Sequence, residues 1–260
     1  MSTKVITKLG VTLAFGLSTV AINSSVSVAG NHQGHQAANT KMASSIPDLR
    51  NEKDVKTKKR KFFNALRPMV IEENKRIEQQ RNSLLQLQQI KSRSAAEEKQ
   101  IDALLDRYRL ERGKDGIVPW TGLLKRVDTV PMELVLSQAA NESAWGTSRF
   151  AREANNLFGQ WCFTKGCGLV PSRRNPGTTH EVAAFKSPQL SVRSYLNNLN
   201  TGRVYADLRT IRAKKRAAGQ TATAYDLAGG LTKYSERGQE YVKEIRAMIK
   251  YNGKYMRGEG

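Results

Sequence analysis

Residues 136–161 read LSQAANESAWGTSRFAREANNLFGQW, and this stretch decides the fold class of the chain. Its apolar spacing predicts a helix that runs from Met132 to about Trp145 and stops at Gly146. A second short helix follows and ends at Asn155 or Asn156, because asparagine tolerates the left-handed turn that closes many helices. Short helices with clear ends indicate a helical domain with many turns.

Glu142 is an unusual residue for its position on the first of these helices. Val135, Ala139 and Glu142 are spaced i, i+4 and i+7, so they share one helix face, and the first two are core-type residues. An apolar face disfavours the charged form of a carboxyl, and the end of a helix is unfavourable for an anion. A carboxylic acid that keeps its proton is what glycoside cleavage requires of a general acid. A capping or ion-paired glutamate is the structural alternative.

Two motifs in this region, QAANESAWGTS from Gln138 and NNLFG from Asn155, resemble the β-N-acetylglucosaminidase domain of bacterial cell-wall hydrolases. That group contains flagellar muramidase-type enzymes and autolysins. The resemblance covers about residues 117–252. It implies an α+β, mostly α, lysozyme-like domain with a small β lobe beside a glycan groove. It also implies that Glu142 is the catalytic acid, and it implies neither a metal nor a cofactor.

The resemblance points to further site residues. Family members carry a second acidic residue on the β lobe, and the candidate here is Glu181, for which an exposed strand charge is the alternative. The late tyrosine motif of the family matches YSERGQEY, which begins at Tyr234 and ends at Tyr241, but Glu236 departs from the usual pattern. Tyr234 is the candidate to bind the N-acetyl group of the sugar, with a packed aromatic residue as the alternative. Tyr241 is a candidate substrate contact.

Three residues of the central stretch are also candidate substrate contacts, namely Trp145, Asn156 and Phe158. The two aromatic rings offer faces on which sugars stack, yet aromatic residues at this spacing more often belong to a core. Asn156 also suits the left-handed end of a helix.

The first 29 residues predict a signal peptide. Lys4 and Lys8 are its only charges, an apolar run extends from Leu9 to Ile22, and Ser27 and Ala29 are the small residues that a signal peptidase needs. An uncleaved anchor is less favoured because the run is shorter than about 18–20 residues. The chain is therefore predicted to be exported to the periplasm or cell envelope.

Export also determines how the two cysteines are interpreted. Cys162 and Cys167 predict a disulfide that closes a short loop, since disulfides persist in exported proteins. A zinc pair is the alternative, but no histidine stands at ligand spacing to complete it.

The rest of the chain divides into a flexible linker at 30–50, a basic helical region at 51–116 and a tail at 253–260, around the catalytic domain at 117–252. The basic region is expected to serve anchoring and not chemistry. Its run from Lys56 to Lys61 is either a solvated helix face or a contact with an anionic membrane or wall surface. Pro68 is expected to break or kink the first helix, and Ser94 with Glu97 predicts a capping box.

Charge and hydropathy limit the possible partners. The 260 residues carry 43 Lys+Arg against 23 Asp+Glu, a formal charge of +20 that attracts polyanions. The mean hydropathy of −0.55 excludes a polytopic membrane protein. Because export removes nucleic acid as a partner, acidic glycans and lipid head groups remain.

Together these features predict an exported peptidoglycan hydrolase that cuts the β-1,4 bond after N-acetylglucosamine. Glu142 would protonate the leaving oxygen, and water would attack with help from Glu181 or from the substrate's own N-acetyl carbonyl. Two alternatives stay open: a lytic transglycosylase, which releases an anhydro sugar, and a non-catalytic wall-binding protein.

Overall fold

The computed structural model describes residues 45–172 and 177–260. The predicted signal peptide and most of the predicted linker lie outside these residues. The helices are α1 (Val55–Gln89), α2 (Ala95–Arg107), α3 (Trp120–Arg126), α4 (Met132–Glu142), α5 (Arg149–Ala154), α6 (Pro188–Thr201), α7 (Ala206–Ala217), α8 (Ala224–Ala228) and α9 (Gln239–Arg257). Short 3-10 helices η1 (Arg203–Tyr205) and η2 (Gly229–Leu231) and strands β1 (Trp161–Cys162), β2 (Gly168–Leu169) and β3 (Glu181–Ala183) complete the fold. The predicted α+β, mostly α class is confirmed.

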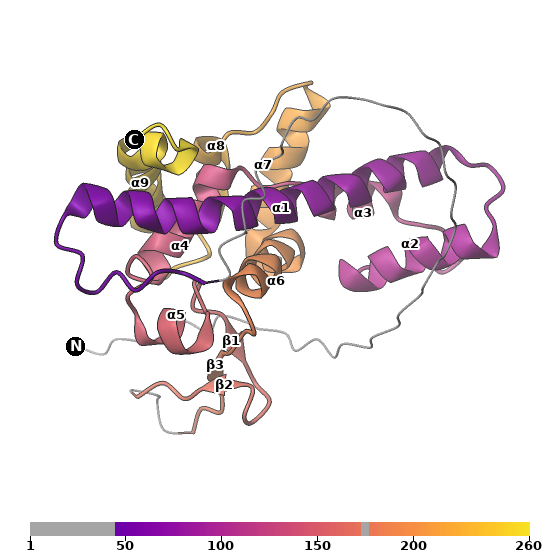
Figure 1. Cartoon of the computed structure of the whole chain (residues 1–260). Coiled ribbons are helices and arrows are strands. Elements are labelled where there is room, and N and C mark those ends of the chain that lie inside the picture. Colours follow the sequence, from indigo (N-terminus) through magenta and orange to yellow (C-terminus); the bar gives the residue numbers. More distant parts are fainter. Residues whose placement is uncertain (1–44, 173–176) are drawn as a thin grey trace, which may run out of the picture.

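Helix α1 is the longest element and crosses the whole molecule (Figure 1). Asp54 caps its start by accepting a hydrogen bond from the Thr57 N–H at 2.8 Å. The helix continues through Pro68, so the predicted break there is wrong. Proline removes one backbone donor, but Leu66 and Met69 on either side of it are buried in the core, and this packing maintains the helix.

The main hydrophobic core joins α1 to α4, α6 and α9. Phe62 and Phe63 of α1 are fully buried in it, so the boundary drawn between residues 116 and 117 does not separate two cores. Leu49, which lies at the end of the predicted linker, is only 2% exposed. Helix α9 also runs past the expected domain end, to Arg257.

Helix α2 folds back beside the second half of α1 and forms a smaller apolar cluster with it and with α3 (Figure 1). The predicted capping box is confirmed, because Ser94 and Glu97 bond to each other's backbone N–H groups. Within the described part of the chain, no helix is both long and apolar enough to cross a lipid bilayer.

A buried carboxylate fastens α1 to α6. Glu73 accepts hydrogen bonds from Arg193 at 2.8 Å, from Gln189 at 2.7 Å and from Arg76 at 2.9 Å. Burial by itself raises the pKa of Glu73, but the hydrogen bonds from Arg193, Gln189 and Arg76 outweigh burial and leave that pKa below its ordinary value. The charged form of Glu73 is therefore part of the folded state.

The β lobe is an antiparallel sheet with strand order β1-β3-β2, packed against α5 (Figure 1). Cys162 pairs with Glu181, and Gly168 pairs with Ala183. A Cβ atom at Gly168 would lie 1.9 Å from the Val182 carbonyl oxygen, so only glycine fits there. Glu181, the acidic residue expected on the β lobe, is the first residue of β3.

Candidate active site

Glu142 is the last residue of α4, and its side chain is partly buried. Val135 and Ala139, two turns and one turn earlier, are fully buried as predicted. The face that carries Glu142 is therefore the core face of the helix. The Glu142 carboxyl therefore lies at the edge of the core, next to the turn that follows α4.

A left-handed turn follows Glu142. The helix predicted to reach Trp145 ends three residues earlier, because Ala144, Trp145 and Gly146 have φ values of 50°, 59° and 76°. A Cβ at Gly146 would lie 3.0 Å from Ile46 Cγ2 and 3.2 Å from the Phe62 ring, a tight fit that adds to the preference of this φ for glycine. Two consecutive non-glycine residues in this conformation are costly and persist where the surroundings fix them.

Glu142 takes part in a buried hydrogen-bond relay. The Tyr241 hydroxyl donates to Glu142 Oε1 at 2.9 Å. Gln138 Nε2 donates to the Tyr241 hydroxyl oxygen at 3.1 Å, and the Tyr195 hydroxyl donates to Gln138 Oε1. Helices α4, α6 and α9 each contribute to this relay, which therefore exists only when all three are packed together.

Four buried tyrosines form or adjoin the relay: Tyr195 and Tyr241 belong to it, and Tyr234 and Tyr205 lie beside it. Tyr234 stacks on Tyr241 with ring centroids 4.9 Å apart, and Tyr205 lies 6.1 Å from Tyr234. Burial, and next the neighbouring negative charge of Glu142, raise the pKa of Tyr241 well above its ordinary value. Burial also raises the pKa of Tyr195 and of Tyr234. These hydroxyls keep their protons, so they serve as neutral donors.

Trp145 and Phe158 pack within the protein. The Trp145 ring lies edge-on to Phe62 and Phe63 of α1, with centroid distances of 5.8 and 5.3 Å. Lys59 Nζ lies 5.6 Å from the centroid of the same ring. Phe158 is buried and stacked on Tyr195 at 3.9 Å. The structure thus shows the packing role for both rings, and a sugar contact at either one stays a prediction.

Asn155 and Asn156 have different structural roles. Asn155 ends α5 with φ of 51°, as predicted for this pair. Asn156 is buried, and its amide donates to the carbonyl oxygens of Gln160 and Ala183, both at 2.8 Å. Its own oxygen accepts from the N–H of Gln160 at 3.0 Å. Asn156 therefore ties the loop after α5 to the β lobe, and contact with substrate stays a prediction.

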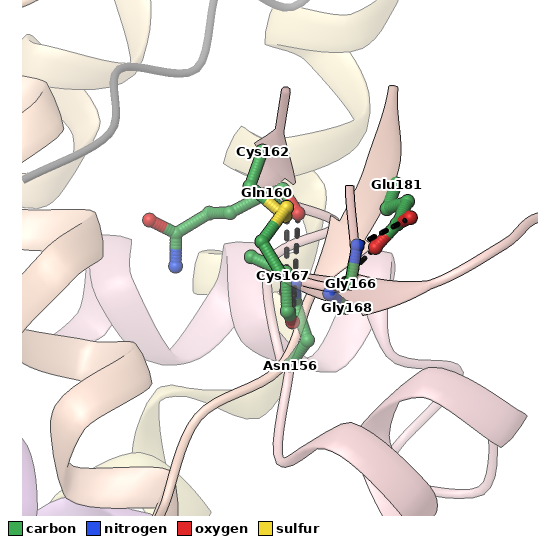
Figure 2. The surroundings of a disulfide bond; sticks show 8 residues. Asn156, Gln160, Cys162, Gly166, Cys167, Gly168 and Glu181 are labelled. Atoms are coloured by element: carbon green, nitrogen blue, oxygen red, sulfur yellow. Dashed lines mark hydrogen bonds between the residues drawn. A yellow bond between two sulfur atoms is a disulfide. The ribbon is translucent and has the colours of Figure 1, made fainter. Parts of the chain in front are cut away.

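Glu181 holds the β lobe together. Figure 2 shows its carboxylate aimed at the loop that carries Cys167, where Oε1 accepts from the Gly166 N–H at 2.9 Å and Oε2 from the Gly168 N–H at 2.8 Å. Glu181 is 5% exposed, so the alternative of an exposed strand charge is wrong. The sequence leaves exposure open as an alternative because a short strand next to polar residues does not show which of its faces is covered.

The predicted disulfide between Cys162 and Cys167 is present (Figure 2). Their sulfur atoms and a Glu181 oxygen lie within 4.8 Å of one another, a spacing that also suits a metal ion. Both sulfur atoms are in the disulfide and are therefore not thiolates, which argues against zinc binding by this pair.

The structure brings Glu142, Tyr241 and Tyr234 together and places two hydrogen bonds of Glu181 within its own lobe. Gln138 and Tyr195 also belong to the site, although neither is among the residues predicted from the sequence. A signal exists for Gln138, because it precedes Glu142 by four residues and so shares its helix face. Nothing in the local sequence pairs Tyr195 with α4.

Comparisons with known proteins show what the chain is similar to. The sequence profile described as "Glucosaminidase: Mannosyl-glycoprotein endo-beta-N-acetylglucosaminidase" matches residues 121–254. The chain is similar to Protein bax of Escherichia coli (strain K12), at 35% identity over 215 residues, which cover 82% of this chain and 77% of that protein. No solved structure matches the chain significantly.

Proposed function

This chain belongs to the glucosaminidase family, and from that premise we propose that it is an exported hydrolase that cleaves the β-1,4 bond after N-acetylglucosamine in peptidoglycan. The observation that carries the proposal is the carboxyl of Glu142, partly buried at the end of α4 and bonded on one oxygen by Tyr241. In this proposal Glu142 protonates the leaving oxygen of the glycosidic bond.

The second half of the reaction needs a partner for the attacking water or for the sugar cation. Both oxygens of Glu181 already accept backbone hydrogen bonds at 2.9 and 2.8 Å, which favours a structural role for this residue. We therefore favour the route in which the substrate's own N-acetyl carbonyl stabilises the anomeric carbon. Tyr234, stacked on Tyr241 beside Glu142, is the residue proposed to orient that group.

Binding to an anionic wall or membrane surface is a further part of the proposal. Lys56, Arg60 and Lys61 are exposed in the first turns of α1, although Lys61 pairs with Glu52 at 2.7 Å. Replacing Lys56 and Arg60 by glutamine should weaken sedimentation with purified peptidoglycan at low salt. If the variant and the unmodified protein bind equally, these residues form a solvated helix face and do not contact the wall.

The reaction is tested by mass spectrometry of purified peptidoglycan after digestion. Fragments that end in reducing N-acetylglucosamine are the expected products. Anhydro sugar ends would instead identify a lytic transglycosylase, and intact glycan strands would indicate a wall-binding protein. A parallel digest with Glu142→Gln controls for contaminating hydrolases.

A further inference from the structure

The side-chain amide of Gln138 is fully buried and engaged at both ends. Its oxygen accepts from the Tyr195 hydroxyl of α6, and its nitrogen donates to the Tyr241 hydroxyl of α9. Gln138 lies one turn before Glu142 on α4, so one helix holds both ends of the path from the amide to the carboxyl. Each of these bonds determines the direction of the next.

A hydroxyl carries a single hydrogen, so accepting a bond leaves that hydrogen for another partner. Because the Tyr241 oxygen accepts from Gln138, its hydrogen is directed at Glu142 Oε1, 2.9 Å away. A proton on Oε1 that pointed toward Tyr241 would clash with the hydroxyl hydrogen. Oε1 is thus held as the acceptor of this bond.

We propose that Gln138 is a positioning residue that determines, through Tyr241, which oxygen of Glu142 carries the proton given to the leaving group. The inference rests on the proposed role of Glu142 as the general acid. The neutral amide is the required chemistry, because one end donates and the other accepts. A carboxylate of the same shape at this position would only accept, and it would take the Tyr241 hydrogen for itself.

The titratable groups that face this relay come from four elements and one loop. They are Tyr195 on α6, Tyr205 on η1, Tyr241 on α9, Tyr234 on the loop before α9, and Glu142 itself. The tyrosines keep their protons over the ordinary range of assay pH, since burial raises the pKa of each one. The tyrosines of this set therefore act as neutral hydrogen-bond donors.

The first test is the pH profile of Gln138→Glu. While the introduced carboxyl is ionised, it accepts from both tyrosines, so the Tyr241 hydrogen turns away from Glu142. Turnover near pH 7 should then fall about 10- to 100-fold, with KM changed little. At acid pH the introduced carboxyl regains one donor and one acceptor, and the ratio of variant to unmodified turnover should rise. A ratio that stays flat with pH would overturn the inference.

The second test asks whether Gln138 acts through Tyr241. Gln138→Met keeps the length of the side chain and removes both hydrogen bonds. In the unmodified protein it should lower kcat, whereas in a Tyr241→Phe background it should have little further effect, because coupled residues are non-additive. Ser137→Ala, which removes a neighbouring buried hydroxyl bonded to the Glu133 carbonyl, is the matched control and should keep full turnover.

The remaining outcomes are also decisive. Full additivity of the two substitutions, or an unchanged kcat for a folded Gln138→Met, would contradict the inference while leaving Glu142 as the acid. An active Glu142→Gln variant would instead contradict the proposed function itself. If the Gln138 variants fail to fold, Tyr195→Phe is the substitute test. It removes the hydrogen bond to the Gln138 oxygen, so the Gln138 amide can rotate by 180°, and kcat should fall while KM does not rise. An unchanged kcat for Tyr195→Phe would overturn the inference on its own.

Discussion

The ring of Phe63 lies edge-on against the ring of Trp145, with centroids 5.3 Å apart, although 82 positions separate them in the chain. This contact joins α1 to the turn that follows Glu142, within a core that α1 shares with α4, α6 and α9. The basic helical region is therefore joined to the candidate active site by packing as well as by the chain.

We expect Phe63→Ala to lower the free energy of unfolding by about 3–5 kcal/mol, since it leaves a cavity in a fully buried site. Phe163→Ala, at an exposed phenylalanine of the β lobe, is the matched control and should cost far less. Urea denaturation measures both. Although the sequence assigns residues 51–116 to anchoring, a chain that begins at Ile117 should be insoluble or unfolded, because it lacks the α1 side of the core. A stable, active fragment would contradict this.

Glu142→Gln should fold normally and lose about 10²- to 10⁴-fold in turnover, because the amide keeps the shape of the acid and has no proton to give. Release of soluble fragments from peptidoglycan measures the loss. Glu133→Gln, at the other end of the same helix, is the control and should remain active. Near-normal turnover by Glu142→Gln would exclude it as the acid.

Glu181→Gln should loosen the loop of the β lobe, because an amide nitrogen replaces one of the two oxygens that accept from Gly166 and Gly168. Hydrogen exchange at these two backbone amides should become faster. Glu153→Gln on α5, where the carboxylate is exposed and forms a long ion pair with Arg149 at 3.9 Å, should leave their exchange unchanged. Unaltered exchange in Glu181→Gln would show that these bonds contribute little.

Turnover separates the two proposed second steps. If the N-acetyl group of the substrate assists, Tyr234→Phe should lower kcat by roughly tenfold or more, and Glu181→Ala should retain most of its activity. The reverse pattern, together with rescue of Glu181→Ala by added azide, would instead make Glu181 the base or nucleophile. Each variant should first be checked for its melting temperature.

Glu73 should make the fold sensitive to acid. Its pKa is lowered in the folded state, so its contribution to stability is complete at neutral pH, begins to be lost below about pH 4.5, and disappears as pH falls through the folded value. Glu73→Gln should therefore cost about 3–5 kcal/mol at pH 7 and show a flatter fall in acid. Glu72→Gln, at the exposed neighbouring residue, should reproduce the unmodified curve. Parallel acid profiles for all three proteins would contradict this assignment.

Several features could be predicted from the sequence because they depend on neighbours within a few residues. The capping box at Ser94, the left-handed end of α5 at Asn155, and the helix face that carries Glu142 all follow from local spacing. The disulfide also follows, because five positions separate its cysteines. The family motif added the fold class and the identity of the candidate acid.

Other features depend on segments that meet only in the folded chain. Pro68 lies inside a helix because the core holds both of its flanks, and Glu181 is buried because the loop after β1 folds over it. Tyr195 and Gln138 are 57 positions apart in the chain, so no local pattern predicts the hydrogen bond between them. The sequence by itself determined which residue is the candidate acid. The packing of α4 against α6 and α9 decided how that acid is held, because hydrogen bonds between distant residues form only after the burial of apolar surface has brought the helices together.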